Sequence, residues 1–170
     1  LLGLPNVITT PHLSGDTNAA KQKSTIDACQ GVISVLNGHT PQYPVNLPMP
    51  LPTDVEYYQP YLLLTQQLGC FTQQISRGTI GSLEFIYAGE IAKKNIALLK
   101  INFLLSFLKC GGEKNVNLVN AFFIAQDKGI KITESKTKET NNFTSLFTVK
   151  AKSDKEEHII SGTVMRKQPH

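Results

Sequence analysis

The sequence predicts an α+β fold, and three observations point to it. Apolar residues recur at helical spacing over Gln59 to Ser76, and the run Ile96 to Leu108 is almost wholly apolar. Four shorter segments have strand character, with apolar residues alternating against polar ones. A four-stranded, mostly antiparallel sheet with helices on one face would bury these apolar surfaces. With 170 residues, 41% of them hydrophobic and 18% charged, the chain is long and apolar enough to form a globular core.

The first 38 residues read as one strand followed by one helix. Val7 to Thr10 is a β-branched run typical of a strand, and Asn18 to Leu36 carries apolar residues at helical spacing. Asn37-Gly38 would end the helix. Because no partner strand is near in the sequence, we expect the apolar face of this helix to pack against polypeptide outside the 170 residues.

Residues 39–52 form the predicted boundary between domains. Five prolines occur there, at positions 41, 44, 48, 50 and 52, and they exclude a helix and favour an extended linker. The sequence therefore predicts one unit over residues 1–38 and a second domain over residues 53–170.

Within the second domain the elements follow in order along the chain. Pro60 is tolerated in the first turn of the helix from Gln59 to Ser76. The 13 residues from Ile96 to Leu108 fall short of the roughly 20 that cross a bilayer, so a membrane span is rejected and a helix buried on more than one side is predicted. The remaining predicted elements are a strand over Thr79 to Tyr87, a short helix over Val116 to Asp127, and an antiparallel meander of Ile130 to Lys136, Phe143 to Ala151 and His158 to Met165.

The positive charge is confined to the second half of the chain. The net charge is +4, with −2 over residues 1–76 and +6 over residues 77–170. Basic residues interleaved with aromatic ones, as in a nucleic-acid surface, are not found, so we expect no nucleic-acid partner. A small anionic ligand or a solvated surface explains the excess.

The three cysteines, Cys29, Cys70 and Cys110, are odd in number and widely spaced. Without a C-x-x-C pair or a histidine cluster, we expect neither a disulfide framework nor a metal site, and a reducing compartment fits best. No charged segment precedes an apolar run at the start, so no signal peptide is expected and a cytoplasmic location is predicted.

Thr10-Pro11-His12-Leu13 is the candidate catalytic motif. His12 follows the end of a predicted strand, where open α/β sheets place functional groups, and an imidazole can exchange a proton with a substrate hydroxyl near neutral pH. Position alone also fits a structural or incidental histidine.

A resemblance to a known family across nearly the whole chain favours the catalytic interpretation of His12. Asn6 to Thr17 resembles the segment that ends the nucleotide-binding domain of D-2-hydroxyacid dehydrogenases, where a Pro-His pair carries the acid/base. Val45-Asn46-Leu47-Pro48 resembles the junction into the extra domain of long-form D-3-phosphoglycerate dehydrogenases. Further similar motifs follow in the same order: Pro60-Tyr61-Leu62, Leu68-Gly69, Ser82-Leu83-Glu84, Gly89-Glu90, Val119-Asn120-Ala121, Gly129-Ile130, Glu134-Ser135-Lys136 and Gly162-Thr163-Val164.

The resemblance implies a Rossmann-type core whose last strand and helix are residues 1–38, in a parent enzyme that oxidises 3-phosphoglycerate with NAD in serine biosynthesis. It implies His12 as the acid/base. The family's glutamate and arginine partners and its G-x-G-x-x-G turn have no counterpart here, since the arginines are Arg77 and Arg166 and no glutamate precedes Glu56. We therefore expect the isolated segment to be inactive and to bind no cofactor. The family pattern also differs at Ser14-Gly15-Asp16, where it has Gly-Ala-Ser, and at Phe122, where it has proline.

Residues from about 53 onward resemble the allosteric substrate-binding domain of that family. This implies self-assembly into a homo-oligomer and binding of phosphate or a phosphorylated hydroxy acid. We select Lys136, Arg166 and Lys167 as candidate anion contacts. A solvated edge-strand lysine is the alternative for Lys136. For the whole chain, a stand-alone anion-binding module and a dehydrogenase of another 2-hydroxy acid remain as alternatives.

Overall fold

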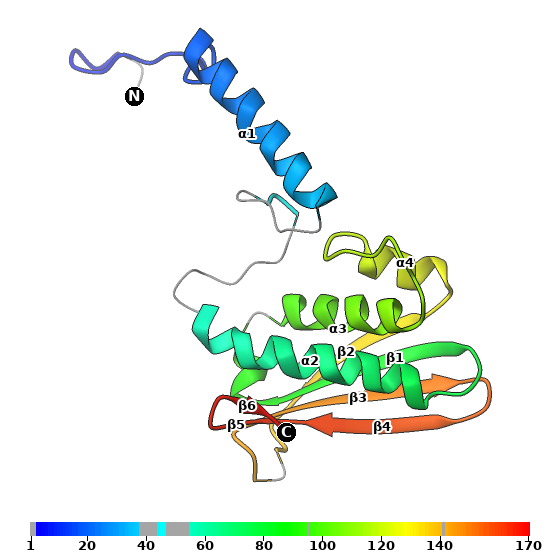
Figure 1. The fold of residues 1–170 in the computed structure, drawn as a ribbon. Helices are drawn as coiled ribbons and strands as arrows, with labels where there is room; N and C mark the ends of the chain where they lie inside the picture. The colour runs from blue at the N-terminus through cyan, green and yellow to red at the C-terminus, as the bar shows by residue number, and fades with distance from the viewer. Residues whose placement is uncertain (1–2, 38–43, 47–54, 95, 141) are drawn as a thin grey trace. The chain divides into compact units, whose positions relative to one another are not determined.

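The computed structural model describes residues 3–37, 44–46, 55–94, 96–140 and 142–170 (Figure 1). It divides into two compact units, residues 1–45 and 46–170. The predicted proline-rich linker, residues 39–52, lies outside the described residues except for positions 44–46. The elements are α1 (Asn18–Leu36), α2 (Val55–Ile75), β1 (Ile80–Gly89), the 3₁₀ helix η2 (Glu90–Lys93), α3 (Ala97–Cys110), α4 (Ala121–Asp127), β2 (Lys131–Thr137), β3 (Ser145–Ser153), β4 (Glu157–Gly162), β5 (Val164–Met165) and β6 (Gln168–Pro169).

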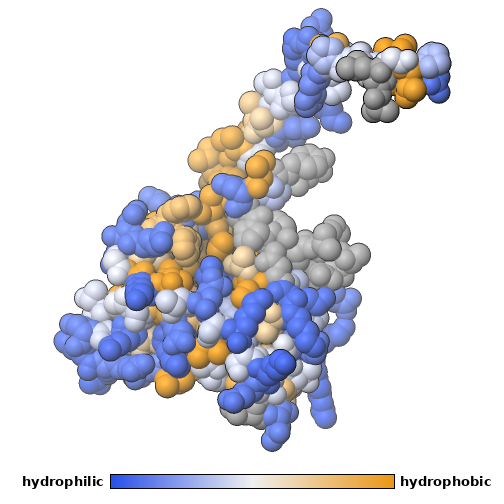
Figure 2. All heavy atoms as spheres, turned by 180° about the vertical axis from the view of Figure 1, so that it is seen from behind, coloured by the Kyte–Doolittle hydropathy of each residue, from blue (hydrophilic) through white to orange (hydrophobic). Residues whose placement is uncertain are grey.

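The first unit contains the predicted helix but not the predicted strand. Thr17 caps α1, its hydroxyl accepting a hydrogen bond from the Ala20 N–H at 3.1 Å. The prediction of a strand over Val7 to Thr10 is wrong: these residues have no regular secondary structure and pair with no strand among the described residues. A strand needs a neighbour for its backbone hydrogen bonds, and the described part of this unit has no second strand. Several apolar side chains of α1 are exposed, namely Ile26, Val32, Ile33, Val35 and Leu36. Figure 2 shows hydrophobic, orange surface along this helix.

The second unit is built on a four-stranded sheet in the order β2-β1-β3-β4. The pairs β1–β3 and β3–β4 are antiparallel, whereas β1–β2 is parallel. Helices α2 and α3 lie over one face (Figure 1). The predicted α+β class, with a mostly antiparallel four-stranded sheet covered by helices, is confirmed.

The predicted meander of the last three strands is wrong in part. β3 and β4 do form a hairpin, but β1 lies between β2 and β3. The chain passes from β1 through α3 and α4 before β2, and such a crossover returns β2 parallel to β1. The end of the third predicted run, Val164–Met165, belongs to a separate two-stranded hairpin with β6.

Helix α4 is shorter than predicted. Residues 116 and 117 are irregular and residues 118–120 form a turn, in which the Asn117 side chain accepts hydrogen bonds from the N–H groups of Val119 at 2.9 Å and Asn120 at 3.0 Å. Asparagine side chains compete in this way with helical hydrogen bonds. The helix therefore begins only at Ala121.

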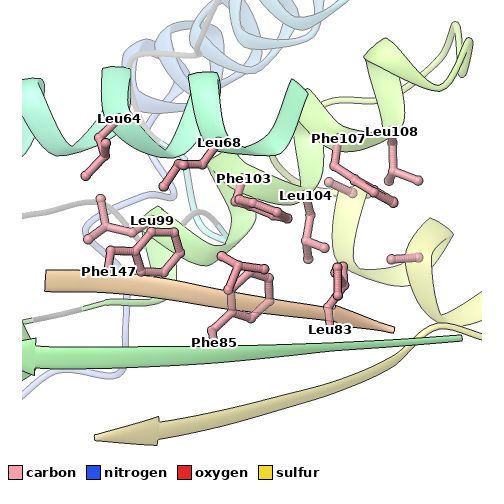
Figure 3. Close-up of a cluster of buried hydrophobic side chains, with 14 of the residues drawn as sticks. Leu64, Leu68, Leu83, Phe85, Leu99, Phe103, Leu104, Phe107, Leu108 and Phe147 are labelled. Carbon is pink, nitrogen blue, oxygen red and sulfur yellow. The ribbon is translucent and has the colours of Figure 1, made fainter. Parts of the chain in front are cut away.

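The core lies between the sheet and the helices α2 and α3 (Figure 3). Leu83, Phe85 and Tyr87 alternate along β1 and are fully buried. Phe103 contacts Phe85 edge-on, with ring centroids 5.1 Å apart. Seven residues of α3 are buried, which confirms the prediction of a helix covered on more than one side: Leu98, Leu99, Phe103, Leu104, Ser106, Phe107 and Leu108.

A disulfide joins Cys70 of α2 to Cys110 of α3, so the expectation that the chain forms no disulfide is wrong. The two Cα atoms are 5.4 Å apart although 40 residues separate them in the sequence. Their proximity results from the packing of α2 on α3, which no cysteine spacing reveals. Cys29 is free and exposed.

No helix among the described residues combines the length and the apolar character needed to cross a bilayer.

Candidate functional site

The candidate catalytic residue, His12, lies in an exposed bend ahead of α1. Its side chain forms no hydrogen bond or ion pair with any residue that the structure describes. The acid nearest in sequence, Asp16, pairs with Lys21 at 2.6 Å. An imidazole acting as an acid or base needs a group that fixes its tautomer and orientation, and the described residues supply none.

The candidate anion contacts Arg166 and Lys167 form the tip of the β5–β6 hairpin. Met165 pairs with Gln168, so Arg166 and Lys167 are the two loop residues, with φ values of 51° and 64°. Positive φ at both positions is the type I′ arrangement that matches strand twist, although glycine or asparagine adopts it at lower cost.

The hairpin is fixed to the rest of the domain through its base. Thr163 and His170 exchange backbone hydrogen bonds of 2.7 and 2.8 Å, and the Thr163 hydroxyl donates to the Ser145 carbonyl at 2.6 Å. The two cationic side chains are thus carried on an ordered support.

A hollow of about 410 Å³ lies between this hairpin and the start of α2. The Lys167 ammonium pairs with the Glu56 carboxylate at 2.6 Å at an exposed position. This hydrogen-bonded pair lowers the pKa of Glu56 and raises that of Lys167. The hollow is lined by Glu56, Tyr57, Pro60, Tyr61, Val164 and Lys167.

Tyr57 contributes an aromatic wall and a polar atom to this hollow. Its hydroxyl is buried and lies close to the hydroxyl groups of Tyr61 and Ser145. Burial raises the pKa of Tyr57, which keeps the phenol protonated and able to donate. The Lys94 ammonium lies 5.2 Å from the centre of the Tyr57 ring.

The third candidate, Lys136, lies apart from the hairpin. It is exposed on β2 at one edge of the sheet, whereas the hairpin follows β4 at the opposite edge. Three strand spacings separate these edges, about 14 Å. No hydrogen bond or ion pair joins the Lys136 side chain to another described residue. The structure therefore brings Arg166 and Lys167 together but not Lys136.

A metal site is not formed by the described residues, since no three His, Cys, Asp or Glu side chains gather there.

Comparison with known proteins decides the family. Residues 57–170 match the model of the D-3-phosphoglycerate dehydrogenase intervening domain. The chain belongs to the D-3-phosphoglycerate dehydrogenase family.

Individual members of the family align with almost the whole chain. A D-3-phosphoglycerate dehydrogenase of Methanocaldococcus jannaschii is 33% identical over 169 residues, which are 99% of this chain and 32% of that protein. One from Archaeoglobus fulgidus is 29% identical over 163 residues, covering 96% of this chain and 31% of that protein. The chloroplastic D-3-phosphoglycerate dehydrogenase 2 of Arabidopsis thaliana is 31% identical over 135 residues, covering 77% of this chain and 22% of that protein. The chain spans about a third or less of the length of these relatives.

Several motifs that resemble the D-3-phosphoglycerate dehydrogenase family have structural roles in this chain. Gly89 has a φ of 76°, and a Cβ there would lie 2.3 Å from the Thr144 carbonyl oxygen, so only glycine fits. Asn120 donates its side-chain amide to the Asn115 carbonyl at 2.9 Å and accepts from the Asn117 N–H at 2.8 Å. These two motif residues therefore maintain the fold.

Two further positions have specific contacts. Phe122, at which the family resemblance led us to expect proline, lies beneath the Lys100 ammonium, 5.2 Å from the ring centre. Lys100 also pairs with Glu134 of the Glu134-Ser135-Lys136 motif, which ties α3 to β2. The motif that suggested an anion contact is therefore partly a structural ion pair.

Sequence reasoning missed Glu56, Tyr57 and Tyr61 as residues of the hollow. Tyr57 and Tyr61 are four residues apart on α2 and their rings are 5.3 Å apart. That spacing predicts neighbouring side chains on a helix. It does not reveal that the hairpin, more than a hundred residues later, closes the hollow.

Proposed function

We propose that the chain is the effector-binding and oligomerisation part of a D-3-phosphoglycerate dehydrogenase, a cytoplasmic enzyme that oxidises 3-phosphoglycerate with NAD in serine biosynthesis. The match of residues 57–170 to the family's intervening domain carries this proposal. The names of the relatives support the reaction class. The chain spans only about a third of their length, which supports the proposal that it is a non-catalytic part of such an enzyme.

In the whole enzyme, His12 would act as the acid/base that takes the substrate hydroxyl proton. In the 170-residue chain it lacks the groups that would act with it, because no arginine precedes Arg77 and no glutamate precedes Glu56. Catalytic groups that act as a unit lose nearly all their effect when separated. Mixing the chain with NAD and 3-phosphoglycerate should therefore yield no NADH, and accumulation of NADH would refute this part of the proposal.

The anion site that the geometry supports best lies at the tip of the β5–β6 hairpin. Arg166 offers a planar set of donors that fits a phosphate, and Lys167 adds a point charge beside it. The Glu56 carboxylate already occupies Lys167, so an incoming anion must displace it. Phosphate or a phosphorylated hydroxy acid would then bind across the mouth of the hollow. Lys136 is retained as a separate contact at the opposite edge, because its ammonium has no partner among the described residues.

Titration calorimetry with inorganic phosphate and with 3-phosphoglycerate tests the site. Arg166→Ala and Lys167→Ala should each weaken binding at least about threefold, as expected for the loss of one exposed charge contact. Glu56→Gln should tighten binding, because the amide no longer competes for Lys167. If Glu56→Gln does not bind phosphate more tightly and the two alanine variants bind it with unchanged affinity, the hairpin is not the anion site.

Lys136→Ala provides a separate measurement. If this variant binds less phosphate than the wild type, Lys136 is a second anion contact at the β2 edge. If its isotherm is unchanged, Lys136 is not an anion contact. All anion binding at these exposed positions should weaken as the salt concentration rises.

Self-association is the second part of the proposal. The apolar sides of α3 are covered inside the domain, so an interface must come from other surfaces. Leu63 and Phe71 project from α2 with about half of each side chain exposed. Light scattering should give a mass above 18.7 kDa, and a Phe71→Gln variant should shift the mass toward the monomer. A monomer at high concentration would contradict this part.

A further inference from the structure

The disulfide between Cys70 and Cys110 ties together the two helices that cover the sheet. Cys70 lies in α2, next to the point where Gly69 allows α3 to approach closely, and Cys110 is the last residue of α3. Their Cα separation of 5.4 Å is well within the range that a disulfide can bridge. The packing of the helices therefore presents the two sulfur atoms to each other.

The bridge lies at the surface rather than in the core. Cys110 is exposed, Cys70 is half-buried, and neither belongs to the cluster of buried hydrophobic side chains. The Gln74 side chain donates a weak hydrogen bond to the Cys70 sulfur at 3.5 Å. A small thiol can therefore reach the disulfide from solvent, as exchange requires.

The domain has a core that does not depend on the bridge. The aromatic rings of Phe85, Phe103 and Phe147 pack against one another, and a mixed sheet and two long helices surround them. Domains that require disulfides to fold are small and lack such a core. We therefore expect the fold to form without this disulfide, and in a reducing compartment an accessible bridge of this kind is transient.

We propose that Cys70 and Cys110 form a reversible redox pair that sets the rigidity of the α2–α3 contact. In the reducing direction, two glutathione molecules exchange with the disulfide. The bond between the two sulfur atoms breaks, each sulfur gains one electron and one proton, and one molecule of oxidised glutathione leaves. In the oxidising direction, oxidised glutathione accepts the same two electrons and the bond re-forms.

The effect of reduction follows from the segment that the bridge closes. The chain from Cys70 to Cys110 contains β1, η2 and α3, so the bond restricts the unfolded state of the central strand and its covering helix. At the end of α3, Gly111 and Gly112 are held by backbone hydrogen bonds of 3.1 and 3.0 Å to Phe107 and Lys109. Without the bridge this last turn is held by those bonds and by the packing of Gly111 on Gln73, so it should fray more readily.

Thiol counting on the purified 170-residue chain tests the proposal directly. The chain is equilibrated in glutathione buffers of stepped ratio, alkylated and mapped by mass spectrometry. At oxidising ratios we expect the Cys70–Cys110 bond, with Cys29 free or joined to glutathione. At reducing ratios we expect three free thiols, and the Cys70–Cys110 bond should show a single midpoint within the glutathione range. The melting temperature, measured by circular dichroism, should fall by about 10 °C when the disulfide is reduced. Hydrogen exchange should increase most in residues 105–112.

Variants separate the bridge from general effects of the reductant. Cys70→Ser and Cys110→Ser should melt as the reduced wild type does and should not respond to glutathione. Cys29→Ser is the matched control and should keep the full response. If either bridge variant fails to fold, the thiol count on the wild type still decides.

Three outcomes would overturn the proposal. Free Cys70 and Cys110 at every glutathione ratio would show that the bridge does not form. A bridge that persists in millimolar dithiothreitol would show that it is not reversible. Reduction without any change in melting or hydrogen exchange would show that it does not set the rigidity of the helix pair.

Discussion

Gly69 of α2 faces the Phe103 carbonyl of α3 so closely that a Cβ at Gly69 would lie 2.4 Å from that oxygen. The two helices can therefore pack at this distance only because position 69 carries no side chain. Backbone atoms cannot move away as the end of a flexible side chain can.

Gly69→Ala should accordingly separate α2 from α3 and lower the free energy of unfolding by about 3 kcal/mol. Urea denaturation followed by circular dichroism measures the loss. Gly81→Ala is the control, because its Cβ would meet only the Lys152 carbonyl, at 3.9 Å. If both variants have the same stability, the close approach at Gly69 is not needed.

Tyr87→Phe should raise the free energy of unfolding by about 1 kcal/mol. The Tyr87 side chain is fully buried, and its hydroxyl has no partner among the described residues. Burial raises the pKa of Tyr87, with a smaller contribution from Glu134, so the group is a neutral phenol whose desolvation is uncompensated. Phenylalanine removes the hydroxyl and keeps the ring.

Thr72→Val provides the contrast to Tyr87→Phe. The buried Thr72 hydroxyl donates to the Leu68 carbonyl at 2.7 Å, so its removal should lower stability by about 1 kcal/mol. Chemical denaturation of both variants tests whether their free energies of unfolding change in opposite directions. A destabilised Tyr87→Phe variant would mean that the tyrosine hydroxyl has a partner after all.

Lys100 connects three elements, since its ammonium pairs with Glu134 of β2 and lies over the Phe122 ring of α4. Lys100→Met should lower stability by about 1 kcal/mol, because a partly exposed ion pair and a cation–π contact each contribute modestly. Lys131→Met, at an exposed lysine without a charged partner among the described residues, should change stability by less than about 0.5 kcal/mol. Equal losses in urea denaturation would contradict this assignment.

Acid should destabilise the β3–β4 turn through Glu156. Its carboxylate accepts a hydrogen bond from the backbone N–H of Arg77 at 2.6 Å and lies 3.0 Å from Nε2 of the His158 ring, an ion pair when the histidine is protonated. These contacts, the histidine first, lower the pKa of Glu156 below its ordinary value of 4.5. The stabilisation is therefore complete above about pH 4.5 and is lost as the pH falls through the lowered pKa.

Melting temperatures measured from pH 7 to pH 3 check this dependence. The wild type should lose more of its melting temperature below pH 4.5 than Glu156→Gln, which cannot titrate there. Glu157→Gln, at an exposed carboxylate without an ion pair among the described residues, should behave as the wild type. Parallel curves for the wild type and Glu156→Gln would show that the turn does not respond to acid.

Local patterns were sufficient for α1, α2 and α3 and for the strands of the four-stranded sheet, but they also predicted a strand over Val7 to Thr10 that does not form. Each of the helices α1, α2 and α3 has an apolar face, and the spacing of apolar residues along the sequence reveals that face. The strand order was not predictable in the same way. Ile80–Gly89 and Lys131–Thr137 pair in parallel only because α3 and α4 return the chain to the same edge of β1.

The candidate site was predictable only in part, for the same reason. Arg166 and Lys167 were selected as further candidate cations after Lys136, and the hairpin does hold the two side by side. Their counterpart Glu56 and the walls Tyr57 and Tyr61 come from the other end of the domain, so their contact depends on tertiary packing. The disulfide between Cys70 and Cys110 was not predicted, because it depends on the distance between the two residues in the folded structure and not on their spacing in the sequence.

The central position of β1 also determines when the sheet can be completed. During synthesis, α2 and α3 are complete once Cys110 has been added and can cover Leu83, Phe85 and Tyr87 before either neighbouring strand exists. The polypeptide must grow by 27 residues beyond the end of α3 at Cys110 to complete β2 at Thr137, and by 43 residues to complete β3 at Ser153. Until then both edges of β1 are unpaired templates for another chain, which makes the half-made domain, rather than the finished one, the state most exposed to aggregation.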